Sequence, residues 1–211
     1  MADQLIFYTN PMSRGQIVRW MLEEVGAPYE PRILEYGTTM KDAAYLAINP
    51  MGKVPAIVHD GKIVTECAAI CAYLADAFPA AGLAPAPADR ADYYRWLFFT
   101  SGPVEQAITS KHFGLEPTGE QQRMAGFGSL AMALDALESA VAGKPFVAGD
   151  RFSAADVYVG SQIDWGLQFG TIPSRPAFEA YVAPLRTRAA YKRAKDIDNA
   201  LIAEMQAAGT G

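Results

Sequence analysis

The spacing of hydrophobic residues near the start of the chain changes from that of a strand to that of a helix. Residues 5–8 form a short β-branched and aromatic run that stops at Asn10-Pro11, which is typical of a buried strand. Ser13 and Gln16 have the S-x-x-Q spacing of a capping box, which indicates the start of a helix. Apolar residues then recur at a helical period, at Ile17, Met21 and Val25.

The segment up to residue 78 contains signals for a second strand, a short helix and a hairpin. Residues 29–34 can form the strand, and the region of residues 40–46 can form the helix. Two β-branched runs, 56–59 and 62–65, flank an Asp-Gly pair, which is the strongest short-range hairpin signal in the chain. A helical period resumes after Glu66. The predicted order is strand, helix, strand, helix, strand, strand, helix.

A proline-rich stretch then interrupts this order. Residues 79–87 contain three prolines and a glycine, which is the composition of a linker. Beyond it the periodicity is helical. We therefore predict an α/β domain at residues 1–80, a linker at residues 81–88 and an all-helical domain at residues 89–211.

Three features of the second half give more detail. Apolar residues keep one continuous helical period from Met124 to Val141. Ser153 and Asp156 have capping-box spacing, which predicts the start of a helix that runs through Trp165. Basic residues between 186 and 195 alternate with alanine beside two aspartates, which favours a solvated helix face.

Composition narrows the possible partners. The chain has 211 residues, 51% of them hydrophobic, with 18 basic and 23 acidic side chains and a formal net charge of -5. Such a chain has no basic field that would gather phosphates, so nucleic acid is not expected as a partner. The first residues do not resemble a leader peptide and no run of eighteen apolar residues occurs, so we expect neither export nor a membrane span.

The two cysteines, Cys67 and Cys71, are too few for a disulfide framework, and they lack the neighbouring His or Cys ligands that a zinc site needs. This usage favours a reducing, cytoplasmic location and predicts no bound metal. The two histidines, His59 and His112, are too few and too far apart in the sequence to suggest a metal site or a nucleophile triad.

Four stretches in this order resemble the cytosolic glutathione S-transferases, especially bacterial ones, over essentially the full length. They are residues 8–19, 49–55, 65–70 and 149–156. The resemblance implies a thioredoxin-like α/β domain that binds glutathione, followed by an all-α domain that lines the pocket for an apolar electrophile. It also implies a homodimer and a role in detoxification.

The resemblance assigns glutathione contacts to two of these stretches. Val54 and Pro55 would be joined by a cis peptide bond and would present backbone groups to the cysteinyl part of glutathione. Glu66 would bind the γ-glutamyl ammonium, and Lys53 would meet the glycyl carboxylate. Cys67 stands where the family usually has serine, so the backbone N–H must contribute more there. An ordinary loop proline and a solvated lysine are the alternatives for Pro55 and Lys53.

Glutathione is nucleophilic as its thiolate, so the enzyme must lower the pKa of the thiol with a hydrogen-bond donor and a nearby cation. Different alignments within the family place Ser13, Tyr8 or Asn10 at the catalytic position, and we favour them in that order. Arg14 matches an arginine that assists the thiolate. A structural helix cap, a core tyrosine and a solvated arginine are the alternatives for Ser13, Tyr8 and Arg14.

The C-x-x-C position of thioredoxin-like proteins contains no cysteine here, because residues 10–13 are Asn-Pro-Met-Ser. A disulfide oxidoreductase that uses a thiol at the first helix is therefore disfavoured. Cys67 precedes another helix, but its spacing from Cys71 is typical of packing, so we do not expect a redox role.

An apolar wall for the electrophile is expected from one methionine and five aromatic residues. They are Met12, Tyr94, Phe98, Phe99, Trp165 and Phe169. Aromatic residues at helical spacing more often belong to the core, so we expect only some of them to line a site.

The function that these features favour is addition of the glutathione thiolate to small hydrophobic electrophiles. A non-catalytic binding or regulatory module of the same fold is the alternative from another class. A glutathione-dependent dehalogenase, isomerase or reductase would use the same first domain.

Overall fold

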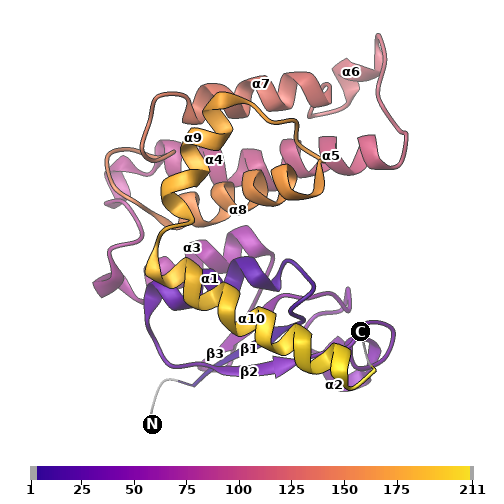
Figure 1. Ribbon diagram of the computed structural model, residues 1–211, viewed down its shortest axis with the longest axis vertical. Coiled ribbons are helices and arrows are strands. Elements are labelled where there is room, and N and C mark those ends of the chain that lie inside the picture. Colours follow the sequence, from indigo (N-terminus) through magenta and orange to yellow (C-terminus); the bar gives the residue numbers. More distant parts are fainter. Residues whose placement is uncertain (1–3, 210–211) are drawn as a thin grey trace. The chain divides into compact units, whose positions relative to one another are not determined.

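The computed structural model describes residues 4–209 (Figure 1). The chain forms two compact units: one contains residues 4–83 and 187–209, and the other contains residues 84–186. Among the described residues, none of the helices combines the length and apolar character needed to cross a membrane.

A mixed four-stranded sheet forms the centre of the first unit. Its strands are β1 (Leu5–Thr9), β2 (Glu30–Ile33), β3 (Ala56–His59) and β4 (Lys62–Thr65), in the order β2-β1-β3-β4. Strand β2 is parallel to β1, whereas β3 is antiparallel to both β1 and β4. The hairpin is present at the predicted Asp-Gly pair, where Asp60 and Gly61 both have positive φ, as a tight turn between twisted strands requires.

The described part of the first unit also contains four α-helices, α1 (Gly15–Val25), α2 (Ala43–Leu46), α3 (Cys67–Ala77) and α10 (Ala189–Ala207), and a 3-10 turn at Thr39–Lys41. Helix α1 contacts both α3 and α10 (Figure 1). Phe7 is fully buried and lies under the Arg19 guanidinium of α1. Successive strand residues face opposite sides of a sheet, so Tyr8 faces away from α1 and packs against Tyr45 of α2.

The expected capping box at the start of α1 does not form. Arg14 is the residue before the helix, and the Ser13 hydroxyl accepts a hydrogen bond from the Gly15 N–H instead of that of Gln16. The Gln16 side chain donates to the Pro11 carbonyl. The sequence prediction was wrong here because a sharp turn of the loop places other polar groups closer to both side chains. A Cβ on Gly15 would lie 1.9 Å from the Thr9 Oγ1, so only glycine fits where α1 begins beside β1.

The second unit is all helical. It contains α4 (Ala91–Phe99), a π-helical turn (Thr100–Val104), α5 (Glu105–His112), α6 (Gln121–Met124), α7 (Leu130–Val141), α8 (Ala154–Phe169) and α9 (Pro176–Leu185). Helix α8 is mostly buried and contacts α4 and α9. The predicted capping box is present at its start, where the Asp156 carboxylate accepts the Ser153 N–H at 2.9 Å.

The continuous helix expected from Met124 to Val141 is wrong. The chain breaks between α6 and α7, where Gly128 has a φ of 65° and the Ser129 hydroxyl caps α7 by accepting the Met132 N–H. Met124 is 90% exposed. A hydrophobic period alone could not reveal that a Gly-Ser pair ends one helix and begins the next.

The fold class predicted from the sequence is confirmed: a thioredoxin-like α/β arrangement is followed by an all-helical unit. Two short single-turn helices, Pro79–Ala81 and Pro87–Asp89, lie in the proline-rich segment. The last helix, α10, belongs to the first unit, because its apolar face and its charged side chains meet α1. The division into domains at residues 81–88 stays a prediction.

Candidate active site

The strand register brings three of the predicted segments to one end of the sheet. Tyr8 of β1 pairs with Ala56 of β3, and Ala56 pairs in turn with Thr65 of β4. The loop that follows β1, the segment that precedes β3 and the residue that follows β4 therefore leave the sheet at the same end. The separate stretches to which the resemblance assigned glutathione contacts thus lie beside neighbouring strands.

The segment before β3 is held by two side chains that sequence reasoning did not select. The Val54–Pro55 peptide bond is cis, as the resemblance implied. The Tyr45 hydroxyl and the Asn49 amide both donate to the Lys53 carbonyl. Burial raises the pKa of Tyr45 to about 12, so its hydroxyl keeps its proton and remains a donor at neutral pH. The Lys53 side chain is exposed.

Glu66 occupies the position between β4 and α3 in an uncommon backbone conformation. Its φ is 67° and its ψ is 118°, although it is not a glycine, and its side chain is exposed. Such a conformation costs on the order of 1 kcal/mol and is often found at binding sites. The next residue, Cys67, is 8% exposed, and its thiol lies 3.6 Å from the Arg14 carbonyl. The starts of α1 and α3 therefore adjoin.

The Asn10 side chain is bound at both ends. It is 1% exposed, its Nδ2 donates to the Leu34 carbonyl at 2.8 Å, and its Oδ1 accepts the Met12 N–H at 2.9 Å. These bonds tie the loop after β1 to the chain after β2. The Asn10 side chain therefore holds the loop after β1 in place.

The Ser13 hydroxyl is also engaged within the loop. It donates to the Asn10 carbonyl at 2.6 Å and accepts the Gly15 N–H at 2.9 Å. The sharp turn brings the Asn10 carbonyl within reach of the hydroxyl, so the hydroxyl hydrogen is already used inside the loop. Ser13 is 8% exposed.

Tyr8 is half-buried, and its ring centroid lies 5.4 Å from that of Tyr45. The Tyr45 hydroxyl binds the Lys53 carbonyl, so the Tyr8 ring lies in the cluster beside the segment that leads into Pro55. The Tyr8 hydroxyl makes no hydrogen bond to any other residue of the range 4–209. At the start of α1, Arg14 is exposed and Met12 is 43% exposed.

The aromatic residues expected to contact the electrophile lie on two helices of the second unit that contact each other, α4 and α8. On α4, Tyr94 is 42% and Phe98 is 69% exposed, with ring centroids 6.5 Å apart, while Phe99 is half-buried against Trp96. At the end of α8, Trp165 and Phe169 stack edge to face at 6.2 Å, and Phe169 is 72% exposed.

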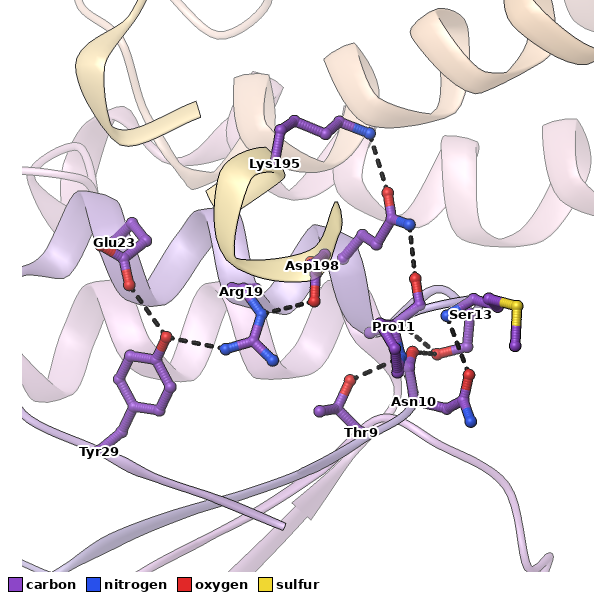
Figure 2. Close-up of polar contacts among 12 residues, drawn as sticks. Thr9, Asn10, Pro11, Ser13, Arg19, Glu23, Tyr29, Lys195 and Asp198 are labelled. Atoms are coloured by element: carbon purple, nitrogen blue, oxygen red, sulfur yellow. Dashed lines mark hydrogen bonds and ion pairs between the residues drawn. The ribbon is translucent and has the colours of Figure 1, made fainter. Parts of the chain in front are cut away.

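A buried polar network between α1 and α10 was not found by sequence reasoning (Figure 2). Arg19 and Asp198 are each 1% exposed and form an ion pair at 2.7 Å. Arg19 also donates to the Tyr29 hydroxyl, which donates in turn to Glu23. Burial raises the pKa of Tyr29 to about 12, so this hydroxyl keeps its proton. The sequence signal is an arginine inside the apolar stretch of α1.

The prediction that the basic residues between 186 and 195 form a solvated helix face needs correction for three of them. The Arg188 guanidinium makes two bonds to the Glu24 carboxylate, at 2.6 and 2.7 Å, and Arg193 contacts Glu23. Lys195 donates to the Gln16 side chain. These residues are bound to α1 rather than simply solvated. The alternation with alanine did not reveal the partners because they lie far away in the sequence.

Comparisons with known proteins agree with this arrangement. Residues 12–77 match the family model described as glutathione S-transferase, N-terminal domain, and residues 120–165 match the corresponding C-terminal domain. The crystal structure of a glutathione transferase from Methylococcus capsulatus is 30% identical, with a TM-score of 0.76 over 92% of this chain and 98% of that one. A sphingomonad glutathione S-transferase complexed with glutathione is also 30% identical, with a TM-score of 0.74 over the same shares.

A curated relative, a probable glutathione S-transferase from Oryza sativa, is 32% identical over 159 residues, which are 70% of this chain and 66% of the relative's own length. A thioredoxin-like unit followed by an all-helical unit is the arrangement of the glutathione S-transferase fold. The chain belongs to the glutathione S-transferase family.

Proposed function

We propose that the protein binds glutathione and transfers its thiolate to small hydrophobic electrophiles. One observation carries the proposal: the loop after β1, the cis Val54–Pro55 segment and Glu66 leave the sheet at the same end. Two similar solved proteins, the sphingomonad transferase and a Sulfitobacter homologue that is 28% identical, are described with bound glutathione. Their likeness supports the same ligand here.

The glutathione backbone would be held by three groups of contacts. The main chain just before the cis Val54–Pro55 bond is fixed through the Lys53 carbonyl, and its free backbone groups would pair with the cysteinyl residue of the ligand. The exposed Glu66 carboxylate would bind the γ-glutamyl ammonium, and the N–H groups at the start of α3 would bind the neighbouring carboxylate. The exposed Lys53 ammonium would bind the glycyl carboxylate.

For the thiolate, the hydrogen-bonding geometry changes the order of the candidates. Asn10 and Ser13 already use their polar groups to shape the loop, whereas the Tyr8 ring packs against the cluster that Val54 also joins. We propose that Tyr8 donates to the sulfur and that the Arg14 charge and the start of α1 favour its anionic form.

In the reaction the glutathione thiol loses its proton to solvent, and the sulfur lone pair forms a bond to the electrophilic carbon. For a substitution, the leaving group departs with the electron pair of the broken bond. For an addition, that pair moves to the adjacent acceptor atom, which takes a proton from solvent. Tyr8 would stabilise the thiolate before the new bond forms.

Stopped-flow absorbance at 240 nm measures thiolate formation and tests this assignment. We expect Tyr8→Phe to raise the apparent pKa of bound glutathione by about one unit, since it removes one hydrogen bond to an anion. Asn10→Ala and Ser13→Ala should disturb the loop and weaken binding more than they change the thiol pKa. A Tyr8→Phe variant with the pKa of the wild type would refute the role of Tyr8.

Binding itself is tested separately by calorimetry. Glutathione should bind the wild type at millimolar concentration or below, and Glu66→Gln should weaken the affinity by about tenfold through loss of a charged partner. A wild type that does not bind would refute the transferase and favour a non-catalytic module of the same fold.

The second substrate would contact exposed aromatic side chains of the helical unit, and Tyr94, Phe98 and Phe169 are the exposed ones among those expected from the sequence. A screen of aryl halides, activated alkenes and disulfides with glutathione separates transferase, dehalogenase and reductase activity. We expect Phe98→Ala to raise KM for the apolar substrate while leaving KM for glutathione unchanged. A homodimer, a cytoplasmic location and a role in detoxification are part of the same proposal, and light scattering tests the first of these.

A further inference from the structure

Two hydrogen bonds connect helix α10 to the loop after β1 (Figure 2). The Lys195 ammonium donates to the Gln16 Oε1 at 2.9 Å, and the Gln16 Nε2 donates to the Pro11 carbonyl at 2.6 Å. The three residues come from α10, from the first turn of α1 and from the loop between β1 and α1, which leads into Arg14. A side chain far away in the sequence therefore reaches the candidate active site through one intermediate amide.

The chemistry of the partners fixes the orientation of that amide. An ammonium can only donate, and a carbonyl oxygen can only accept. The Gln16 oxygen must therefore face Lys195, and its nitrogen must face Pro11. A flipped amide would lose both bonds at once. Lys195 is itself half-buried, with its ammonium 5.6 Å from the centre of the Tyr191 ring, so it presents its charge from an anchored position.

The Pro11 carbonyl and the Met12 N–H belong to one planar peptide group. Gln16 binds the carbonyl side of this plane, and the Asn10 Oδ1 binds the N–H side at 2.9 Å. The peptide is therefore held from both sides. The next residue, Ser13, bonds back to the Asn10 carbonyl through its N–H and its hydroxyl. Rotation of the plane would displace the whole turn that leads into Arg14 and α1.

We propose that Lys195 is a positioning residue for the loop of residues 10–14, and that it acts through Gln16 on the Pro11–Met12 peptide. Its effect on catalysis rests on the proposed transferase function, because it requires that this loop lies beside the thiolate. Lys195 does not touch the reacting atoms. Its role is to hold the Gln16 amide in the one orientation that fixes the peptide plane.

Four variants test this role. Lys195→Met removes the charge but keeps the length of the side chain, and Lys195→Arg keeps a donor. Gln16→Glu keeps a partner for Lys195 but cannot donate to the Pro11 carbonyl. Lys192→Met makes the same change as Lys195→Met at an exposed position one turn earlier on α10, and serves as the matched control.

The first measurement is amide hydrogen exchange at Met12 by NMR in the protein without glutathione. We expect exchange about tenfold faster in Lys195→Met and in Gln16→Glu, and near the wild-type rate in Lys195→Arg and Lys192→Met. Gln16→Glu distinguishes positioning of the loop from a contact that only joins α1 to α10. The glutamate would still pair with Lys195 and preserve the contact between the helices, but it could not hold the Pro11 carbonyl. Wild-type exchange at Met12 in either of the first two variants would overturn the proposal.

The second measurement is the apparent pKa of bound glutathione together with kcat. We expect Lys195→Met and Gln16→Glu to raise the thiol pKa by about half a unit and to lower kcat by about tenfold, with KM for the electrophile unchanged. An unchanged pKa and kcat beside faster exchange would overturn the catalytic part of the proposal. Failure of the wild type to bind glutathione would instead refute the transferase function, and the exchange result would still decide whether Lys195 positions the loop.

Discussion

Replacement of Asp198 by alanine should destabilise the first unit strongly, because it leaves the Arg19 guanidinium buried without its carboxylate. Both side chains are 1% exposed, and the atoms that pair are 2.7 Å apart. After the change, Arg19 would keep the Tyr29 hydroxyl and the face of the Phe7 ring, neither of which carries a full negative charge.

The magnitude follows from the burial. Removal of one partner from a buried ion pair costs about 3–5 kcal/mol. The lower end, about 3 kcal/mol, applies here because the remaining contacts of Arg19 offset part of the loss. For a chain of this length each kcal/mol lowers the thermal midpoint by about 2–4 °C, so we expect a fall of roughly 6–12 °C.

The double variant Arg19→Met, Asp198→Leu separates the cost of an unpaired charge from the value of the pair. Burial raises the pKa of Asp198 above its ordinary value, although Arg19 and Lys195 act in the opposite direction. The ionised carboxylate is therefore less favourable in the folded protein than in water. We expect the double variant to recover most of the stability that the single variant loses.

The pH dependence has a definite sign. A raised folded pKa means that the folded state binds the Asp198 proton more tightly than the unfolded state does. The contribution of Asp198 to stability therefore falls as the pH rises from its unfolded pKa of about 3.9 through its raised folded value. The double variant lacks this component.

Urea unfolding followed by circular dichroism at pH 7, and at several values between pH 4 and 6, measures these quantities. A loss below about 1 kcal/mol in Asp198→Ala would show that water or a rearranged partner reaches Arg19, and the argument from burial would be wrong. A double variant that is less stable than Asp198→Ala would show that the pair contributes net stability, which would refute the interpretation of the raised pKa.

Three other changes test separate parts of the structure. Asp156→Ala should lower the free energy of unfolding by about 2–3 kcal/mol, because the buried carboxylate accepts the Ser153 and Val147 N–H groups and the Tyr181 hydroxyl. Calorimetry should show that the folded fraction binds glutathione with unchanged affinity. Glu66→Gly should change the free energy of unfolding by less than about 0.5 kcal/mol, because relief of strain at a φ of 67° offsets the added entropy of the unfolded chain. The same variant should bind glutathione more weakly. A loss of stability above about 1 kcal/mol in thermal unfolding would contradict the argument from backbone strain. Gly15→Ala should lower the free energy of unfolding by about 2 kcal/mol or more, and the thermal midpoint by several degrees, because a Cβ there overlaps the Thr9 side chain of β1. An unchanged midpoint would show that this contact relaxes.

Local patterns were sufficient to predict the order of elements in the first unit. The strand at residues 5–9, the Asp-Gly hairpin and the helix that follows Glu66 each carry their own period and turn signals, so each could be recognised without its neighbours. The start of α1 was misplaced because its polar residues bond within the loop. The break before α7 was missed because the apolar period continues across it.

The candidate site was only partly predictable for a related reason. Motifs indicated which segments meet at one end of the sheet, but the choice among the three donors depends on where carbonyl groups point. The Asn10 carbonyl takes the Ser13 hydroxyl, and the Leu34 carbonyl takes the Asn10 amide, which lies 24 positions away in the sequence. Tertiary hydrogen bonds of this kind leave no periodic signal. Arg19 and Asp198, separated by 179 positions, are the extreme case.

The charges between α1 and α10 explain why such a distant lysine can meet its partner. Arg188, just before α10, and Arg193 of α10 contact Glu24 and Glu23 of α1. The Arg19–Asp198 pair has the opposite polarity. A shift of α10 by one turn, about 5.4 Å, would separate all these pairs and leave Arg19 buried without its carboxylate. The mixed polarity therefore favours one register of the two helices. In that register, Lys195 lies where it can bind the Gln16 amide.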